Sequence, residues 1–199
     1  MQAMQNRRNK TLRLALLGVL TAIIIIQTFV PFLGYIPLGV LNVTIIPVTI
    51  IIAAVVLGPK DGAIVGGVWG MIVFIRAYVA PTSPLAPLVF VNPIISVLPR
   101  ILIGLLAGYA YMAFTKLKLN QSLSLAISAI IGSAVNTILV LGLIFIFYKE
   151  VYADFIKLDV DQVLGALMVI ISTNGVLEAV FAAIVVPIIA RPLLARWKK

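Results

Sequence analysis

The sequence predicts an all-α integral membrane protein, a compact bundle of six transmembrane helices in a single domain over residues 1–199. The first observation is composition: 63% of the residues are hydrophobic and 11% are charged, whereas a soluble domain carries about 25% charged residues. The second is that several apolar runs reach the ~20 residues that a helix needs to cross a bilayer. The third is that the sequence lacks the alternating apolar segments of a membrane β-barrel.

The first span is predicted over residues 11–30, after a run of basic residues. A cleaved signal peptide is the alternative, but no small-residue cleavage site follows the apolar run, and Pro31 comes instead. Within the helix, Ala15, Gly18 and Ala22 form one face of small residues, which another helix can approach closely. This face suits the docking of a partner, and the alternative is packing against the protein's own helices.

The next two spans are predicted over residues 38–57 and 60–78. The turn that precedes them contains Phe32 and Tyr35, aromatic residues that belong at a membrane interface and that can also close over a ligand. Asn42 lies one turn inside the second helix. Glycines in the third helix permit close contact between helices, and its tryptophan is expected to pack in the core or to face lipid.

The fourth span is predicted over residues 92–114. Asn92 is a good N-cap, and Pro93 suits the first helical position, where no backbone N–H is needed. The preceding connection, residues 80–87, contains three prolines in the sequence APTSPLAP. Such a connection cannot be a regular helix, and it is a candidate gate beside the fourth span.

Arg100 follows within this fourth span at a depth of ~12 Å, given a rise of ~1.5 Å per residue. A guanidinium there costs at least ~2.5 kcal/mol to insert unless it faces a cavity or a partner. Pro99 has no N–H to donate, which leaves the carbonyl of Ile95 free. These features predict an anion-binding site. The alternative is that Arg100 neutralises a buried acid elsewhere in the bundle.

The last two spans, predicted over residues 121–147 and 163–190, carry polar residues at depths similar to that of the buried arginine. They are Asn136, Asn174 and Glu178. Each asparagine alone is typical of a hydrogen bond between helices, and Glu178 alone suits a structural pair with the arginine. Their shared depth favours a binding site instead. The candidate ligand-binding residues are Arg100, Asn136, Asn174, Asn92, Ser96, Tyr35, Phe32, Glu178 and Asn42.

The distribution of charge predicts the orientation. Six spans place both termini on one side, which receives eleven basic residues, whereas the other side receives three basic residues and four of the six acids. The positive-inside rule makes the first side cytoplasmic. The predicted protein is therefore a multi-pass cell-membrane protein with cytoplasmic termini, and its site opens outward.

Composition also excludes several classes of function. The sequence contains no cysteine and no histidine, which removes thiol and serine–histidine catalysis and ordinary zinc sites. There is no phosphate-binding loop of the P-loop type and no paired intramembrane carboxylate site. We therefore expect no enzyme, no metal and no cofactor. The basic residues lie at the ends of spans, so they indicate a lipid bilayer and not nucleic acid as the partner.

Three segments resemble the S components, the substrate-binding membrane subunits of energy-coupling factor vitamin transporters. They are residues 36–39 (IPLG), 56–63 (VLGPKDGA) and 92–104 (NPIISVLPRILIG), and the resemblance extends over about residues 12–190. It implies a six-helix S-component-like bundle with an outward-facing vitamin site. It also implies docking on a transmembrane scaffold subunit that carries two ATPase subunits, and toppling of the whole S component to release substrate inside the cell.

The resemblance is greatest to the pantothenate-type members of the family. In the family an A-x-x-x-A face on the first helix docks on the scaffold, and its nearest match here is Gly18-x-x-x-Ala22 together with Ala15. Arg100 favours an anionic vitamin such as pantothenate and disfavours a cationic one such as thiamine. Folate and riboflavin stay open, as does a structural membrane subunit without transport function. An intramembrane enzyme is disfavoured by the missing catalytic residues.

Overall fold

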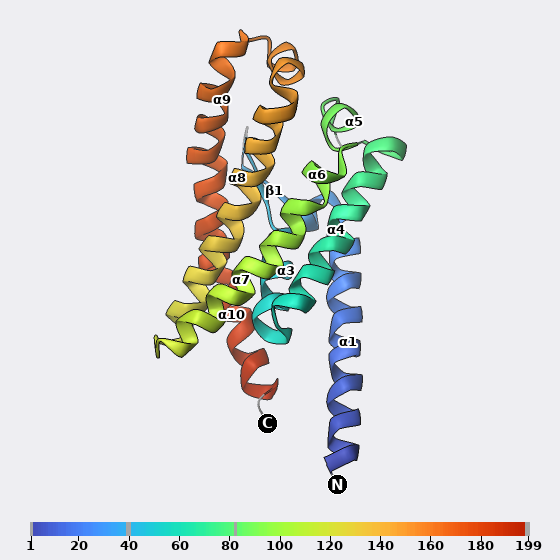
Figure 1. The fold of residues 1–199 in the computed structure, drawn as a ribbon, viewed down its shortest axis with the longest axis vertical. Helices are drawn as coiled ribbons and strands as arrows, with labels where there is room; N and C mark the ends of the chain where they lie inside the picture. Colours follow the sequence, from blue (N-terminus) through green and yellow to red (C-terminus); the bar gives the residue numbers. More distant parts are fainter. Residues whose placement is uncertain (1, 39–40, 82, 198–199) are drawn as a thin grey trace.

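The structure is a computed structural model that describes residues 2–38, 41–81 and 83–197, and it is almost entirely helical. The helices pack as a bundle around one short central helix (Figure 1). The elements are α1 (Gln2–Phe29), α2 (Pro31–Gly34), β1 (Tyr35–Leu38), β2 (Leu41–Thr44), α3 (Ile46–Leu57), α4 (Pro59–Val79), α5 (Ala86–Val89), α6 (Pro93–Ser96), α7 (Leu98–Lys116), α8 (Gln121–Ile156), a 3₁₀ turn (Val160–Gln162), α9 (Val163–Ile170), a π-helical turn (Ile171–Gly175) and α10 (Val176–Trp197).

Within the described residues, five helical stretches are long and apolar enough to cross a membrane. They are Thr11–Phe29, Pro59–Val79, Pro93–Lys116, Gln121–Ile156 and Val160–Arg196. The sixth apolar helix, α3, has 12 residues and is therefore ~18 Å long, shorter than the ~30 Å hydrocarbon core. A multi-pass membrane protein follows, but the expected count of six full spans is not confirmed.

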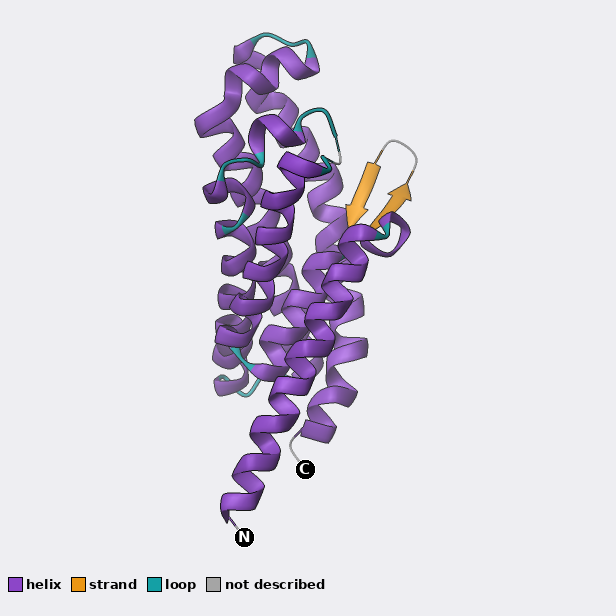
Figure 2. Cartoon of the chain, turned by 90° about the vertical axis from the view of Figure 1, so that its right-hand side faces the viewer, coloured by secondary structure: helices purple, strands orange, loops and turns teal. Residues whose placement is uncertain are grey.

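The second helix begins at Ile46 and not at residue 38, because a β-hairpin occupies the preceding residues. Strands β1 and β2 pair antiparallel, with Tyr35 opposite Thr44 and Ile36 opposite Val43. Aromatic and β-branched residues favour strands, and the residue before a proline is biased toward extended backbone, as at Ile36. The hairpin lies at one side of the helical bundle (Figure 2).

Two of the helices predicted as continuous are interrupted. The fourth breaks at Val97 into α6 and α7, since Pro99 removes a backbone donor where the helix would continue. The sixth contains the π-helical turn Ile171–Gly175 between α9 and α10. Helix α8 extends to Ile156, beyond residue 147, with non-helical backbone angles at Tyr148. The first two breaks place polar residues beside the cavity described below.

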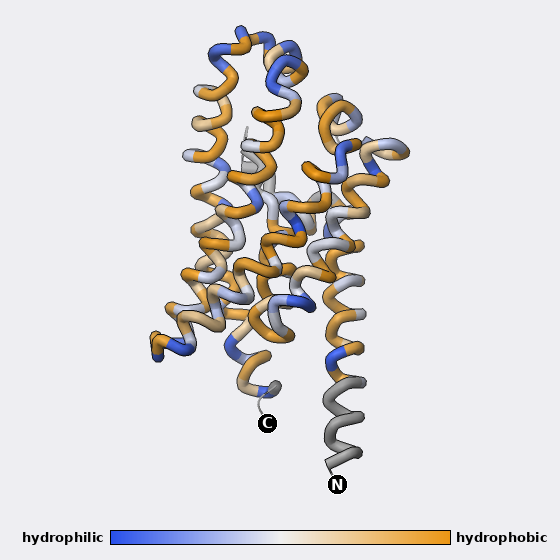
Figure 3. Tube along the Cα trace, viewed as in Figure 1, coloured by the Kyte–Doolittle hydropathy of each residue, from blue (hydrophilic) through white to orange (hydrophobic). Residues whose placement is uncertain are grey.

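The apolar interior consists of two clusters. The first surrounds α3, which is buried almost throughout and is enclosed by α1, α4, α7, α8 and α10. The second lies toward the α8–α9 connection and includes Val89, Ile95, Val140 and Val163. Hydrophilic residues gather at the two ends of the molecule, and hydrophobic residues cover most of the length between them (Figure 3).

Helices α4 and α7 touch through glycines. A Cβ atom at Gly66 would overlap the backbone carbonyl oxygen of Arg100, and one at Gly104 would overlap the backbone of Gly62. Such close backbone approach is available to glycine alone, and small residues at helix interfaces are typical of membrane proteins. The glycines of α4 therefore fix the position of the α7 backbone at Arg100.

Polar contacts attach the membrane-length part of α1, Thr11–Phe29, to the bundle near both ends of that part. Arg13 contacts Asp61 in the first turn of α4 through two bonds, Nε to Oδ2 at 2.6 Å and Nη2 to Oδ1 at 2.5 Å. Near the other end, the Thr49 hydroxyl donates to Gln27 Oε1 at 2.9 Å. The described part of α1 between these contacts presents mostly exposed side chains.

Candidate binding site

A cavity of about 660 Å³ lies within the bundle, inside the ~300–1,000 Å³ range of small-molecule sites. Both apolar clusters contribute to its wall, Trp69 and Tyr35 from the first and Val140 and Phe90 from the second. The lining residues that carry polar groups are Thr28, Tyr35, Thr44, Trp69, Arg76, Arg100, Asn136, Thr137, Asn174 and Glu178. The cavity thus combines apolar walls with polar groups from each of the five membrane-length helical stretches and from the hairpin.

Arg100 is buried, with 5% of its surface exposed. Its Nη1 donates to the Ile95 carbonyl at 2.8 Å, the same carbonyl that Pro99 leaves free. The guanidinium carbon lies 4.9 Å from the centre of the Trp69 ring and 5.5 Å from that of Phe90. These aromatic faces favour a cation, so the local fold holds the guanidinium in place without a carboxylate.

The alternative pairing of Arg100 with Glu178 does not form. Over the described parts of the chain, the ion pair that exists is the one between Arg13 and Asp61. Glu178 Oε1 instead accepts from the Thr44 backbone N–H at 2.9 Å, and Oε2 accepts from the Thr137 hydroxyl at 3.2 Å. Arg100 therefore forms no ion pair with the described residues, and its Nε is buried without a hydrogen-bond partner among them.

Asn136 and Asn174 face the same cavity from α8 and from the π-helical turn. The side-chain oxygen of each is buried and accepts no hydrogen bond from the described residues, so neither oxygen serves a helix–helix hydrogen bond here. A buried polar atom without a partner costs ~1–3 kcal/mol. Single π turns occur often at functional sites, and this one carries Asn174.

Several lining residues were not predicted from the sequence. Arg76 contacts the Thr28 carbonyl through Nη1, lies 5.1 Å from the ring centre of Phe29, and has a buried Nε without a partner among the described residues. A charge at the end of an apolar helix is typical of a residue that sets the membrane topology, so the sequence did not indicate that Arg76 lines a cavity. Trp69, expected in the core or facing lipid, is buried and also lines the cavity.

Other candidates lie outside the cavity wall. Phe32 is 81% exposed and does not line the cavity. Asn92 accepts from the Ile94 N–H at 3.0 Å as an N-cap, and the Ser96 hydroxyl donates to the Asn92 carbonyl at 3.0 Å, so both stabilise α6. The side chain of Asn42 lies outside the described part of the structure. From the proline-rich connection, Ala86 reaches the wall.

The small-residue face of α1 is exposed. Ala15, Gly18 and Ala22 all lie on the outer surface, and a Cβ atom at Gly18 would meet no other atom within 4 Å. Leu17 and Leu20 pack on the first apolar cluster instead. Packing against the described helices of the same chain therefore does not explain this face.

A helical membrane bundle around an internal cavity lined by polar groups defines a class, the membrane-embedded ligand-binding proteins. Within that class, residues 12–190 match the family described as the substrate-specific component of the ECF transporter, and the chain belongs to this family. Its members are substrate-binding components of transporters and not enzymes.

Two curated relatives are similar over nearly their whole length. The chain is 36% identical over 195 residues to the pantothenate transporter PanT of Leuconostoc mesenteroides, and the alignment covers 94% of each chain. It is 30% identical over 191 residues to the pantothenic acid transporter PanT of Lactococcus lactis, and the alignment covers 89% of this chain and 91% of the relative.

Proposed function

We propose that the chain binds pantothenate from outside the cell as the substrate-specific subunit of an ATP-driven uptake transporter. The observation that carries the proposal is Arg100, a buried guanidinium at the cavity wall that contacts no carboxylate of the described chain. Pantothenate supplies a carboxylate, and charge-assisted hydrogen bonds of this kind are strong. The names of the two relatives support the same substrate.

The remaining polar groups of the cavity suit the other functional groups of pantothenate. Asn136 and Asn174 offer free side-chain oxygens to its amide and hydroxyl donors. Tyr35 on the hairpin and Ala86 on the proline-rich connection cover the cavity. A site with both apolar walls and a few directed polar groups is the usual form of a small-molecule site.

Release into the cell requires a partner in this proposal. The exposed face of Ala15, Gly18 and Ala22 docks on a transmembrane scaffold subunit, which carries two ATPase subunits. Toppling of the docked chain, a single membrane domain with both termini cytoplasmic, then opens the cavity inward. The support is the family membership together with the exposure of this small-residue face.

Ligand binding to the purified chain tests the proposal. Because Trp69 lines the cavity, tryptophan fluorescence and calorimetry should both report saturable binding of pantothenate without the partner subunits. Thiamine should not bind, since its cationic charge meets Arg100. Binding of riboflavin or folate in preference to pantothenate would reject the substrate, and the absence of binding for all four would reject the vitamin site.

A further inference from the structure

Among the described residues, three charged side chains line the cavity: Arg76, Arg100 and Glu178. Two cations and one anion leave a net charge of +1 at this wall when all three are ionised. A ligand with one negative charge balances that sum. A neutral ligand leaves one positive charge unbalanced, and a doubly negative ligand leaves one negative charge in a region shielded from water.

Glu178 also has unused capacity to accept hydrogen bonds. Its oxygens accept hydrogen bonds from the Thr44 N–H and from the Thr137 hydroxyl, and the Thr44 hydroxyl is a third partner. A carboxylate offers about four lone-pair sites. Because the carboxylate lines the cavity and forms no ion pair with the described residues, its remaining acceptor capacity is available to an O–H donor of a ligand. The carboxylate repels any group that brings a negative charge.

We propose that Glu178 determines the charge of the accepted ligand: the site takes a monoanion whose far end carries hydroxyl groups, and it rejects dianions. This inference rests on the proposed function, in which Arg100 takes the single carboxylate. The hydroxyl end of the ligand then lies against Glu178. Any ligand whose hydroxyl end has been phosphorylated or oxidised to an acid is excluded by like-charge repulsion.

The size of the expected discrimination follows from elementary electrostatics. Two like charges ~4 Å apart at an effective dielectric constant of ~20 repel enough to weaken binding on the order of 10²- to 10³-fold. Replacing Glu178 by glutamine removes the charge but keeps an oxygen that can accept from the Thr44 N–H. Glu178→Gln is therefore the informative substitution.

The experiment compares three ligands of similar size by calorimetry on purified protein. They are pantothenate, the neutral alcohol panthenol, and the dicarboxylate in which the terminal hydroxymethyl group of pantothenate is oxidised to a carboxylate. Wild type should bind pantothenate best. In Glu178→Gln the preference for pantothenate over the dicarboxylate should fall by about 100-fold or more, through a gain of affinity for the dicarboxylate.

The matched control is Glu150→Gln, because Glu150 is an exposed acid on α8 that does not line the cavity. This control should keep the wild-type preference, and thermal unfolding of both empty variants should report folded protein. If folded Glu178→Gln gains no affinity for the dicarboxylate, or if Glu150→Gln gains as much, the charge-selection proposal is wrong. If wild type binds no pantothenate, the proposed function itself fails, which is a separate outcome.

Discussion

At the scale of the residue, Arg100 is the centre of the site. A guanidinium in the apolar part of a membrane protein is costly, and a buried charge normally has an opposite charge beside it. Here two aromatic rings and the Ile95 carbonyl contact the guanidinium, and no carboxylate of the described residues forms an ion pair with it. We therefore propose that an anionic ligand supplies the counter-charge.

The first prediction concerns Arg100→Met, which keeps the volume of the stem and removes the charge. Losing one partner of a buried charge pair costs ~2–5 kcal/mol, so pantothenate affinity should fall by roughly 30- to 3,000-fold. Calorimetry measures the affinity, and thermal unfolding checks the empty protein. Because Arg100 forms no ion pair with a carboxylate of the described residues, the empty variant should unfold near the wild-type temperature.

Arg196→Met is the control for this prediction, since Arg196 is exposed near the end of α10. It removes one positive charge far along the chain from the cavity wall and should leave binding unchanged. Wild-type affinity for pantothenate in Arg100→Met would remove this arginine from the site. A large loss of stability in that variant, reproduced by Glu178→Gln, would restore the structural pairing.

The part of the site that could be predicted from sequence consists of polar residues in apolar runs. Arg100, Asn136, Asn174 and Glu178 stand out in this way, and the regular helical rise places them at similar depths. Thr44 and Thr137 could not be found, because threonine is ordinary in strands and helices. Their relation to Glu178 depends on how a hairpin and two helices meet, which local sequence does not express.

At the scale of the element, the contact between α4 and α7 positions the site. The second prediction compares Gly66→Ala with Gly67→Ala on adjacent residues of α4. A Cβ atom at Gly66 overlaps the backbone of Arg100, whereas one at Gly67 lies 3.5 Å from an Ile101 side-chain carbon, an ordinary contact. Gly66→Ala should lower both thermal stability and pantothenate affinity, and Gly67→Ala should change neither appreciably. Equal effects of the two substitutions would contradict the close helix contact.

The exposed face of α1 gives the third prediction. Gly18→Leu should abolish uptake in cells that contain the partner subunits, because bulk blocks close helix approach, while pantothenate binding by the purified chain is retained. Gly165→Leu is the control, since a side chain at Gly165 also meets no atom within 4 Å. Uptake by Gly18→Leu at the wild-type rate would exclude this face as the dock, and loss of binding would show that it packs internally.

The elements themselves were only partly predictable. Hydrophobic runs indicate where helices lie, but they do not show that the backbone breaks at Val97 or forms a π turn at Asn174. Pro99 permits the break at Val97 but does not fix where the helix ends, and the residues of the π turn carry no comparable local signal. The hairpin was missed because its residues continue the apolar run that leads into α3, and a short apolar run does not distinguish strand from helix.

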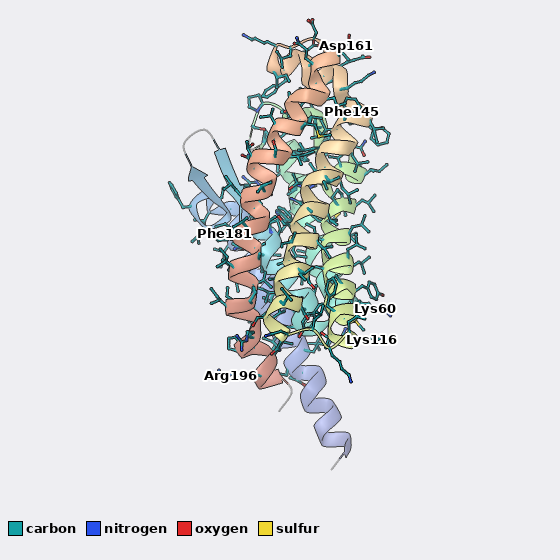
Figure 4. The ribbon with its side chains drawn as sticks, turned by 90° about the vertical axis from the view of Figure 1, so that its left-hand side faces the viewer. Lys60, Lys116, Phe145, Asp161, Phe181 and Arg196 are labelled. Carbon is teal, nitrogen blue, oxygen red and sulfur yellow. The ribbon has the colours of Figure 1, made fainter. Side chains whose placement is uncertain are left out.

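At the scale of the whole molecule, the distribution of charge gives the fourth prediction. Lys60, Lys116 and Arg196 lie at one end and Asp161 at the opposite end (Figure 4), and the positive-inside rule makes the basic end cytoplasmic. The native chain has no cysteine, so single cysteines can be read without background. In intact cells a membrane-impermeant thiol reagent should label Asp161→Cys and should label Lys116→Cys only after permeabilisation. Labelling of both variants in intact cells would contradict this orientation.

The attachment of α1 has a mechanical consequence. A helix attached to its neighbours at one point can rotate about that point. A helix attached at two separated points moves together with the helices to which it is attached. Arg13 is bonded to Asp61 near the start of the Thr11–Phe29 part of α1, and Gln27 is bonded to Thr49 near its end, with ~20 Å of helix between them. A sideways force on the exposed face between these points should therefore act on α3 and α4 together. Since α4 carries the glycine that contacts the backbone of Arg100, we expect the cavity wall at Arg100 to move together with α1 when a partner displaces α1.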